Sequence, residues 1–388
     1  MSDTVPRLVA TAHGWAQFPL RIGLTQRMAF GRVGRPWPMR SGSYTMRVFG
    51  FGKFSRASRH WLFITVLLFT VVSWAIARES TQNFGRWETL TPATIQRTEL
   101  AAAAIGDKIY LVGGFREPSW FETLVNPFFN RPSLIATDAV EEYDTALDRW
   151  RLRAPLPIPV HHASVASAAN RLYVVGGLIQ WPPGRSARVF AYDPTTDSWS
   201  EKTPMPTPRG ALGLVEYTGK IFAIGGIGTN GNSAAVEMYD PETDTWQPRA
   251  TLPTPRDHLA VATSNQRIYA IGGRVGGDFN QNLTSVEAYD PIADRWERVA
   301  DLPTPRSGIA AGMIDDIIYV VGGESPHMTF DLNHAYFPET NHWEKRAPLP
   351  TSRHGLGVVS VHGRLYVLSG GPSPGATYTN VNEVFIPA

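Results

Sequence analysis

The sequence predicts an all-β protein, a six-bladed β-propeller closed by an N-terminal strand and preceded by one N-terminal apolar helix. Two repeated patterns carry the propeller prediction. A Gly-Gly pair follows an apolar, aromatic-containing run six times, and a tryptophan precedes each first glycine by 26 residues, or by 27 in the last repeat. Repeats of about 50 residues that each supply four short strands are typical of propeller blades.

The apolar helix is predicted over residues 61–77, a run without charges that ends in Ala75-Ile76-Ala77. At about 1.5 Å per residue it would be about 25 Å long, near the lower limit for a membrane span. Residues 1–77 carry a net charge of +9 and residues 78–388 a net charge of −7, so the positive-inside rule predicts a cytoplasmic N-terminus and an extracytoplasmic body. Two alternatives stay open: a single-pass anchor in the cell membrane, or a signal peptide cut near Ala77 that releases a secreted or periplasmic body.

The leader, residues 1–60, is basic and rich in glycine and arginine, and nothing in it would build a hydrophobic core. We expect it to be disordered. Either residues 1–45 form a cytoplasmic tail, or Met46 is the true start. A basic leader followed by a mildly acidic body argues against nucleic-acid binding by the body.

Each repeat is expected to form four strands. The first is rich in small residues, as in 100–106, which suits strands that crowd around an axis. A two-residue polar turn such as Asn265-Gln266 leads to the second strand, which ends in Gly-Gly, where a bulge or a close backbone approach is possible. The third strand carries Val-Glu-x-Tyr, as in 236–239, and an Asp-Pro turn leads to the fourth. The fourth strands carry Trp87, Trp150, Trp199, Trp246, Trp296 and Trp343.

The two ends of the body complement each other. The sixth repeat stops after its third strand, whereas residues 86–90 around Trp87 supply a fourth strand without a repeat of its own. We expect residues 86–90 to complete the last blade, because this pairing removes an open sheet edge. The propeller is therefore predicted over residues 86–388.

The combination of Gly-Gly, Tyr before Asp-Pro and regularly spaced Trp resembles the kelch-repeat family, in an exported or membrane-anchored bacterial type, over residues 86–388. The resemblance implies a propeller in which these repeated residues are structural. Two repeats depart from the pattern: the fifth has Tyr336-Phe337-Pro338, and the sixth has Phe385 in place of the tyrosine.

One set of candidate ligand-binding residues follows the Pro-rich connectors between repeats. An arginine recurs there in five repeats, whereas the second repeat has Val160. A ring of arginines would bind carboxylates; alternatively, each arginine pairs with a carboxylate of its own or a neighbouring blade. Residues after the arginine, such as Thr98-Glu99, Asp257 and Ser307, differ between repeats and are better site candidates, because a ligand is asymmetric. The connector candidates are Arg97, His161, His162, Arg209, Arg256, His258, Arg306, Arg353 and His354.

A second set of candidates lies in loops between second and third strands. The largest insertion, residues 115–137, holds Trp120 and Phe121, and the matching loop of the second repeat holds Trp181. These aromatic residues could stack on a sugar, grip a peptide or touch a membrane surface. Alternatively, the insertion folds back over its own hydrophobic surface.

Signals for catalysis are weak. The chain has no cysteine, which excludes disulfides, Cys-ligated zinc and a thiol nucleophile. No metal-ligand spacing, P-loop or G-x-S-x-G motif is present, so no catalytic residue, metal or cofactor is predicted. Glu141, Glu237, Glu287 and Glu383 recur on third strands and are expected on the blade surface. The kelch resemblance includes copper oxidases of the galactose oxidase type, but these need a Tyr–Cys crosslink.

We therefore expect a monomeric module that binds a protein or glycan, with an anionic ligand favoured by the arginines. The resemblance leaves open a sugar-acting enzyme of the periplasmic sialic acid mutarotase-like kelch group. A third class, an intracellular adaptor for ubiquitin ligases, conflicts with the predicted export segment. Whether the chain has any enzymatic activity stays open.

Overall fold

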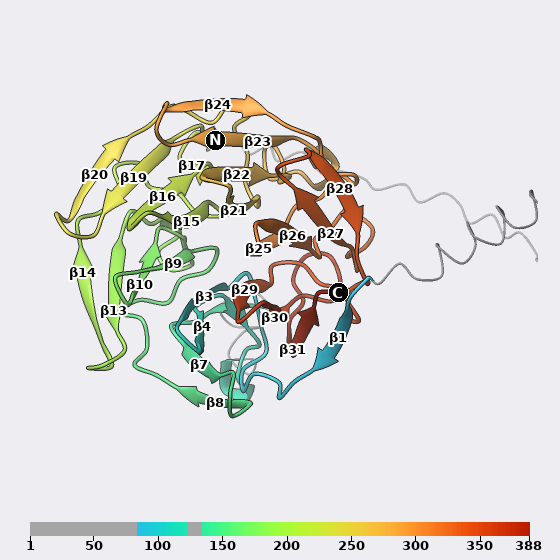
Figure 1. The fold of residues 1–388 in the computed structure, drawn as a ribbon. Coiled ribbons are helices and arrows are strands. Elements are labelled where there is room, and N and C mark those ends of the chain that lie inside the picture. Colours follow the sequence, from blue (N-terminus) through green and yellow to red (C-terminus); the bar gives the residue numbers. More distant parts are fainter. Residues whose placement is uncertain (1–83, 123–133) are drawn as a thin grey trace, which may run out of the picture. The chain divides into compact units, whose positions relative to one another are not determined.

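The computed structural model describes residues 84–122 and 134–388, which form a ring of sheets around a central axis (Figure 1). The strands all belong to the unit that spans residues 77–388. The leader, 1–60, and the apolar segment, 61–77, lie outside the described residues. Across the two described ranges, no helix is both long enough and apolar enough to span a membrane.

Five separate four-stranded antiparallel sheets occur in the described residues, each built from one repeat with its strands in chain order from the axis outward. Their strands are β3 (Ala101–Ile105), β4 (Lys108–Val112), β7 (Val140–Asp144) and β8 (Arg149–Leu152); β9 (Ser164–Ala168), β10 (Arg171–Val175), β13 (Val189–Asp193) and β14 (Ser198–Lys202); β15 (Gly213–Tyr217), β16 (Lys220–Ile224), β19 (Val236–Asp240) and β20 (Thr245–Pro248); β21 (Ala260–Ser264), β22 (Arg267–Ile271), β23 (Val286–Asp290) and β24 (Arg295–Arg298); β25 (Ala310–Ile314), β26 (Ile317–Val321), β27 (Asn333–Phe337) and β28 (His342–Lys345).

The strands expected to form the sixth blade belong to a larger sheet. Strands β29 (Gly357–Val361), β30 (Arg364–Gly370) and β31 (Thr379–Ile386) pair in order, and β1 (Arg86–Thr89) pairs with the outer edge of β31. The predicted closure by the N-terminal strand is therefore confirmed. The long β31 also pairs with β2 (Arg97–Thr98), which leads to β5 (Phe115–Arg116) and β6 (Ile135–Ala136).

The prediction of six equivalent blades is thus corrected. Within the described ranges, five sheets are separate and the last is one seven-stranded sheet, because the connector and the insertion of the first repeat extend it. Shorter elements occupy the other loops: β11 (Leu178–Ile179), β12 (Gly184–Arg185), β17 (Ile227–Gly228), β18 (Gly231–Asn232) and the 3₁₀ helix η1 (Phe279–Gln281).

Glycine places the end of each second strand against the neighbouring connector. In the third repeat Gly225 and Gly226 have φ of +63° and +99°, and a Cβ on Gly226 would lie 2.7 Å from the carbonyl oxygen of Gly210. In the last repeat Ser369 (φ +55°) and Gly370 (φ +100°) take these places. In this repeat the pair equivalent to Gly-Gly is therefore Ser369-Gly370, one residue before the Gly370-Gly371 pair of the sequence. This shift accounts for the 27 residues between Trp343 and Gly370.

Side chains of the regularly spaced Tyr and Trp residues join neighbouring repeats at their outer strands. Trp296 Nε1 donates to the carbonyl of Ala250, in the connector that leaves the preceding repeat, at 2.9 Å. Tyr289 Oη donates to Asp294, which also accepts from the backbone N–H of Ala250. Trp87 makes the same contact with Ala347 and packs on Phe385. These bonds explain why the two residue types recur together.

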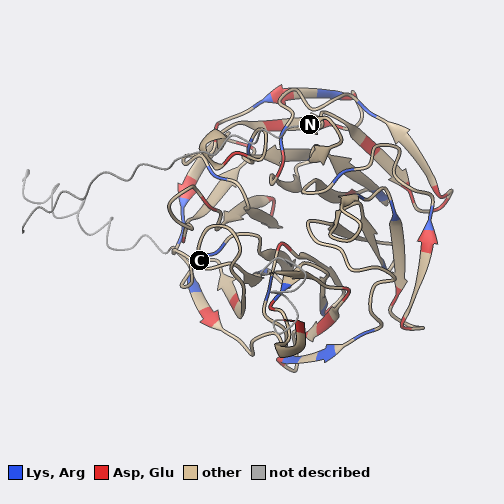
Figure 2. Cartoon of the chain, turned by 180° about the vertical axis from the view of Figure 1, so that it is seen from behind, with Lys and Arg blue, Asp and Glu red and all other residues tan. Residues whose placement is uncertain are grey.

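The outer strands of the ring are rich in charged residues, and the inner strands are poor in them. The outer strands carry acidic and basic residues around the rim, as in β24 (RWER) and β28 (HWEK), whereas inner strands such as β3 (AAAAI) and β21 (AVATS) have none (Figure 2). Mixed charge on the rim suits a solvated surface, and small uncharged side chains allow the inner strands to approach one another. The cores lie between neighbouring sheets, as with Tyr269, Ile271 and Tyr336.

Candidate functional site

The connectors and the loops between second and third strands open on one face of the ring, which we call the connector face. Strand order requires this, because in an antiparallel four-stranded sheet the first strand begins where the second ends. Bridges between the two kinds of segment confirm it, as between Asp257 and Arg274 and between His354 and Gly371. The insertion that holds Trp120 therefore begins on the same face as the connector histidines.

At the axis the connectors form a closed ring of backbone hydrogen bonds. The second residue after each connector arginine, or after Val160, has φ between +51° and +62° and donates its N–H to the carbonyl of its counterpart in the preceding repeat at 2.8–3.0 Å. The ring residues in order are Glu99, His162, Ala211, His258, Gly308 and Gly355, and Glu99 closes the ring on Gly355. This ring fixes the backbone of the candidate site.

A small cavity lies beneath the ring. It has a volume of about 160 Å³ and is lined by ring residues and by the starts of the inner strands, including Ala101, Ala163 and Ala260. Its polar lining comes from Glu99, His162 and His258 of the ring, and the small side chains of the inner strands add apolar lining.

The connector arginines do not line this cavity. Arg97, Arg209, Arg256, Arg306 and Arg353 are all fully buried. Four of them pair with a buried third-strand glutamate at N–O distances of 2.5–2.9 Å: Glu141, Glu237, Glu287 and Glu383 respectively for Arg97, Arg209, Arg256 and Arg353. The expectations of an open arginine ring and of surface glutamates are therefore corrected. The alternative, an arginine paired with a carboxylate of its own blade, holds for these four arginines.

Arg306 differs from the other four arginines. Its repeat has His334 where the others have glutamate, and neither ring nitrogen of His334 has a partner among the described residues. Arg306 Nη2 donates to the carbonyl of Val320 at 3.2 Å. Among the described residues Nε has no partner in any of the five arginines, but Nη1 has none in Arg306 alone. Burial lowers the pKa of Arg306 to about 9. Burial, with Arg306 and Lys345 nearby, lowers the pKa of His334 to about 4.

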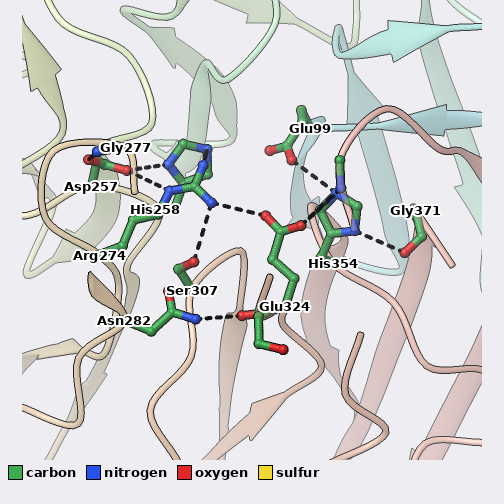
Figure 3. A network of polar contacts seen from close by, with 12 residues as sticks. Glu99, Asp257, His258, Arg274, Gly277, Asn282, Ser307, Glu324, His354 and Gly371 are labelled. Atoms are coloured by element: carbon green, nitrogen blue, oxygen red, sulfur yellow. Dashed lines mark hydrogen bonds and ion pairs between the residues drawn. The ribbon is translucent and has the colours of Figure 1, made fainter. Parts of the chain in front are cut away.

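The residues that differ between repeats gather at the mouth of the axis. Glu99, Asp257, His258 and His354 come from the connectors, and Arg274 and Glu324 join them from the loops (Figure 3). His162, from the connector of the second repeat, lies beside Glu99. We call these seven residues the axial cluster. Sequence reasoning missed Arg274 and Glu324. Both directly follow a Gly-Gly pair, at a place that Phe115, Leu178 and Ile227 occupy in other repeats, so the variation at this place was the signal.

Arg274 holds one side of the axial cluster together. Its guanidinium is 3.2 Å from Asp257 Oδ1 and 3.1 Å from Glu324 Oε1, and it lies over the ring of Phe279. Its Nη2 is 3.0 Å from Nε2 of His258. Because arginine only donates, Nε2 of His258 accepts, and Nδ1 of His258 donates to Asp257 at 2.5 Å.

The opposite side of the axial cluster centres on Glu99. Burial disfavours its charged form, but His162, His258, His354 and Arg274 lower the pKa of Glu99 to about 2. Burial lowers the pKa of His162 to about 3 and that of His161 to about 4, so both imidazoles are neutral near pH 7. His161 stacks on Phe115, beside the cluster.

The charge of the axial cluster argues against the anionic ligand that the arginines suggested. Its three carboxylates, Glu99, Asp257 and Glu324, face one guanidinium, that of Arg274, and this guanidinium is already paired twice. The burial of Asp257 is overcome by a hydrogen bond from His258, so its pKa is lowered. Burial raises the pKa of Glu324. An acidic group at this mouth would meet like charge.

The aromatic candidates are exposed. Relative exposures are 79% for Trp120, 57% for Phe121 and 65% for Trp181. Trp181 borders an apolar pocket of about 360 Å³ that is lined also by Ile135, Ile158 and Ile179. Gln180 ties the two loops together, because its side chain bonds to the backbone of Leu134 and Ala136. Residues 123–133 of the insertion lie outside the described residues, so its predicted fold-back stays an alternative.

Comparison with known proteins gives the family. Residues 130–300 match the KLHDC2/KLHL20/DRC7 Kelch-repeats domain, and residues 305–350 match the Kelch motif. Kelch-like protein terF of Aspergillus terreus is 31% identical over 27% of this chain and 21% of its own length. Kelch-like protein 33 of Homo sapiens is 30% identical over 45% of this chain and 29% of its own. The matched segments thus span less than a third of these relatives.

A solved structure titled "Structure of YjhT" has the same fold. It superimposes with a TM-score of 0.65 at 17% identity, over 78% of this chain and 97% of that one. Such a low identity supports likeness of fold alone. Together with the motif matches and the buried Arg–Glu, Tyr–Asp and Trp contacts that repeat around the ring, these findings give one conclusion: the chain belongs to the kelch-repeat family.

Proposed function

We propose that this chain is a protein-binding module that holds its partner on the connector face through the exposed aromatic residues of its first two repeats. The observation that carries the proposal is Trp181, 65% exposed at the edge of an apolar pocket. Exposed tryptophan beside a pocket is typical of the few residues that dominate binding energy in protein interfaces. Trp120 and Phe121 add apolar area on the same face.

The test uses affinity capture with the full chain as bait. A Trp120→Ala, Trp181→Ala double variant should lose the protein that the wild type retains, because both anchors are removed. Ile292→Ala is the matched control: Ile292 is 84% exposed but lies in the turn between β23 and β24, on the opposite face. Equal capture by all three proteins, or equal loss in both variants, would contradict the proposal.

A glycan is the second ligand class, because exposed tryptophan also stacks on sugar rings. Binding to a glycan array, lost in the double variant and kept in Ile292→Ala, would favour it. The alternative of a sugar-acting enzyme rests on the sequence resemblance alone.

Placement outside the cytoplasm is part of the proposal. The basic leader and the apolar run 61–77 support it, with either a retained anchor or cleavage near Ala77. N-terminal sequencing of the native protein distinguishes these two. Recovery of the intact body from the soluble cytosol would contradict both.

We also propose that β29, β30, β31 and β1 act as the sixth blade. Support comes from the axial ring, to which each of the six repeats contributes one hydrogen bond, and from the bond of Trp87 to Ala347.

A further inference from the structure

His354 in the axial cluster points a ring nitrogen at two carboxylates. Its Nε2 lies 3.5 Å from Glu99 Oε1 and 3.5 Å from Glu324 Oε2 (Figure 3), and the three atoms all lie within 4.8 Å of one another. Ligands bound tetrahedrally at about 2.0–2.1 Å from a zinc ion are separated by about 3.3 Å. The spacing on both sides of His354 is therefore close to that of metal ligands.

The backbone determines which nitrogen of His354 faces the carboxylates. Nδ1 is 3.1 Å from the carbonyl oxygen of Gly371, to which it donates its proton. In neutral His354, Nε2 then presents a lone pair to Glu99 and Glu324, which also present lone pairs, and no hydrogen bond joins three acceptors. A cation between them resolves the conflict. Metal-binding histidines commonly donate their other N–H to a carbonyl in this way.

The remaining contacts of the two carboxylates orient them without using all their lone pairs. Glu99 Oε2 is 3.2 Å from Nε2 of His162, which leaves Oε1 toward His354. Glu324 Oε1 pairs with Arg274, and its Oε2 accepts one hydrogen bond, from the N–H of Gly375 at 3.2 Å. A carboxylate oxygen has two lone pairs, so Oε2 can still bind a cation.

Burial and the excess of carboxylates favour a divalent ion. The side chains of His354 and Glu324 are 1% and 2% exposed, and that of Glu99 is 14% exposed. The axial cluster holds three carboxylates, Glu99, Asp257 and Glu324, but one guanidinium, that of Arg274. Uncompensated buried charge is costly, and one divalent ion balances it. The partial exposure of Glu99 gives an ion a route from the mouth of the axis to these three side chains.

Two glycines provide space beside these side chains. A Cβ on Gly355 would lie 2.7 Å from Glu99 Oε1, and a Cβ on Gly308 would lie 3.4 Å from Glu324 Oε1. Both residues have positive φ, and other repeats place Glu, His or Ala at this ring position. A side chain at Gly355 would clash with the Glu99 carboxylate, whereas one at Gly308 would only come into contact with Glu324.

We propose that Glu99, Glu324 and His354 bind one divalent transition-metal ion, of the Zn²⁺ or Mn²⁺ class. A second group, Glu99 with His162 and His258, is also compact. It is less suited to a metal because Nε2 of His258 already accepts from Arg274. The proposal is independent of protein binding by the aromatic loops.

The test is calorimetric titration of the metal-stripped full chain with ZnCl₂ and MnCl₂. We expect one ion per chain, with affinity weakened more than ~10-fold in His354→Gln and in Glu324→Gln, since loss of a direct ligand exceeds the usual outer-shell effect. His362→Gln is the matched control, because this histidine is exposed and pairs with Asp107 on the surface. It should bind as the wild type does.

A second measurement covers variants that fold poorly. Bound metal should raise the midpoint temperature of wild-type unfolding, with the logarithm of its concentration once that exceeds Kd, and should give no rise in Glu99→Gln. The proposal is overturned if the wild type binds neither ion, if His354→Gln and Glu324→Gln bind as the wild type does, or if only His258→Gln abolishes binding.

Discussion

At the residue scale, the buried Arg–Glu pair is the unit that repeats. Each connector arginine donates to a backbone carbonyl in or just after its second strand, as Arg256 does to Ala270. A threonine hydroxyl donates a hydrogen bond to the paired glutamate, as Thr254 does to Glu287. Breaking such a pair is expensive because it leaves an unpaired buried charge. The pair therefore holds the connector against the sheet and so positions the axial cluster two residues further on.

In the fifth repeat the Arg–Glu pair is incomplete, because His334 takes the place of the glutamate, so a substitution there can create the pair. We expect His334→Glu to stabilise the protein by about 1–3 kcal/mol, because it gives Nη1 of Arg306 a carboxylate partner. Urea unfolding near pH 7 measures the change. Glu287→His, which creates the same defect in the fourth repeat, should destabilise. A less stable His334→Glu protein would contradict this description of Arg306.

His334 should also make stability depend on pH. Its pKa in the folded protein, about 4, is below the unfolded value of 6.5, so the unfolded chain binds more protons between these values. Stability is therefore lost as pH falls through this window. We expect wild type to lose on the order of 2 kcal/mol more than His334→Gln between pH 7 and pH 4.5. Parallel urea titrations at both pH values would measure it, and an equal loss would count against burial of a neutral His334.

At the element scale, β1 closes the ring by pairing with β31. The register places Trp87 opposite Phe385, and the bond from Trp87 to Ala347 ties β1 to the fifth repeat. Without β1, the edge of β31 would be open to pairing with other chains.

The role of β1 can be tested by truncation. A protein lacking residues 1–90 should be less stable than one lacking residues 1–78 by at least ~3 kcal/mol, the usual effect of removing a packed tryptophan. Thermal unfolding of both proteins gives the comparison. Identical melting temperatures would mean that β1 does not close the ring.

Sequence reasoning succeeded where the molecule is periodic. Gly-Gly, Tyr and Trp each recur because every repeat packs in the same way, so their spacing gave the strand order and the closure by residues 86–90. The same periodicity misled at Arg256 and its equivalents. An arginine that recurs in the repeats suggested a ring of cations around the axis. Only the register of the third strand shows that Glu287 lies beside Arg256.

The parts that sequence reasoning missed depend on contacts between repeats. Arg274 and Glu324 belong to different repeats, 50 residues apart, and meet only because both follow a glycine pair on the connector face. The seven-stranded last sheet likewise depends on a pairing between β2 and β31, from opposite ends of the chain. Neither contact has a periodic signal.

At the scale of the whole molecule, repeated residues build the scaffold, and we propose that residues that differ between repeats bind the ligands. The buried arginines belong to the first group; the axial cluster and the aromatic loops belong to the second. Substituting a member of the first group should therefore change stability, whereas substituting a member of the second should change binding.

The most direct test is the free energy of unfolding of Arg256→Ala, with Arg298→Ala as control. Arg256 is fully buried and pairs with Glu287, whereas Arg298 pairs with Asp301 on the surface. We predict a loss of about 3–5 kcal/mol for Arg256→Ala and less than about 1 kcal/mol for Arg298→Ala, with partner capture per folded molecule unchanged in both. An Arg256→Ala protein as stable as the wild type but unable to bind its partner would contradict the account.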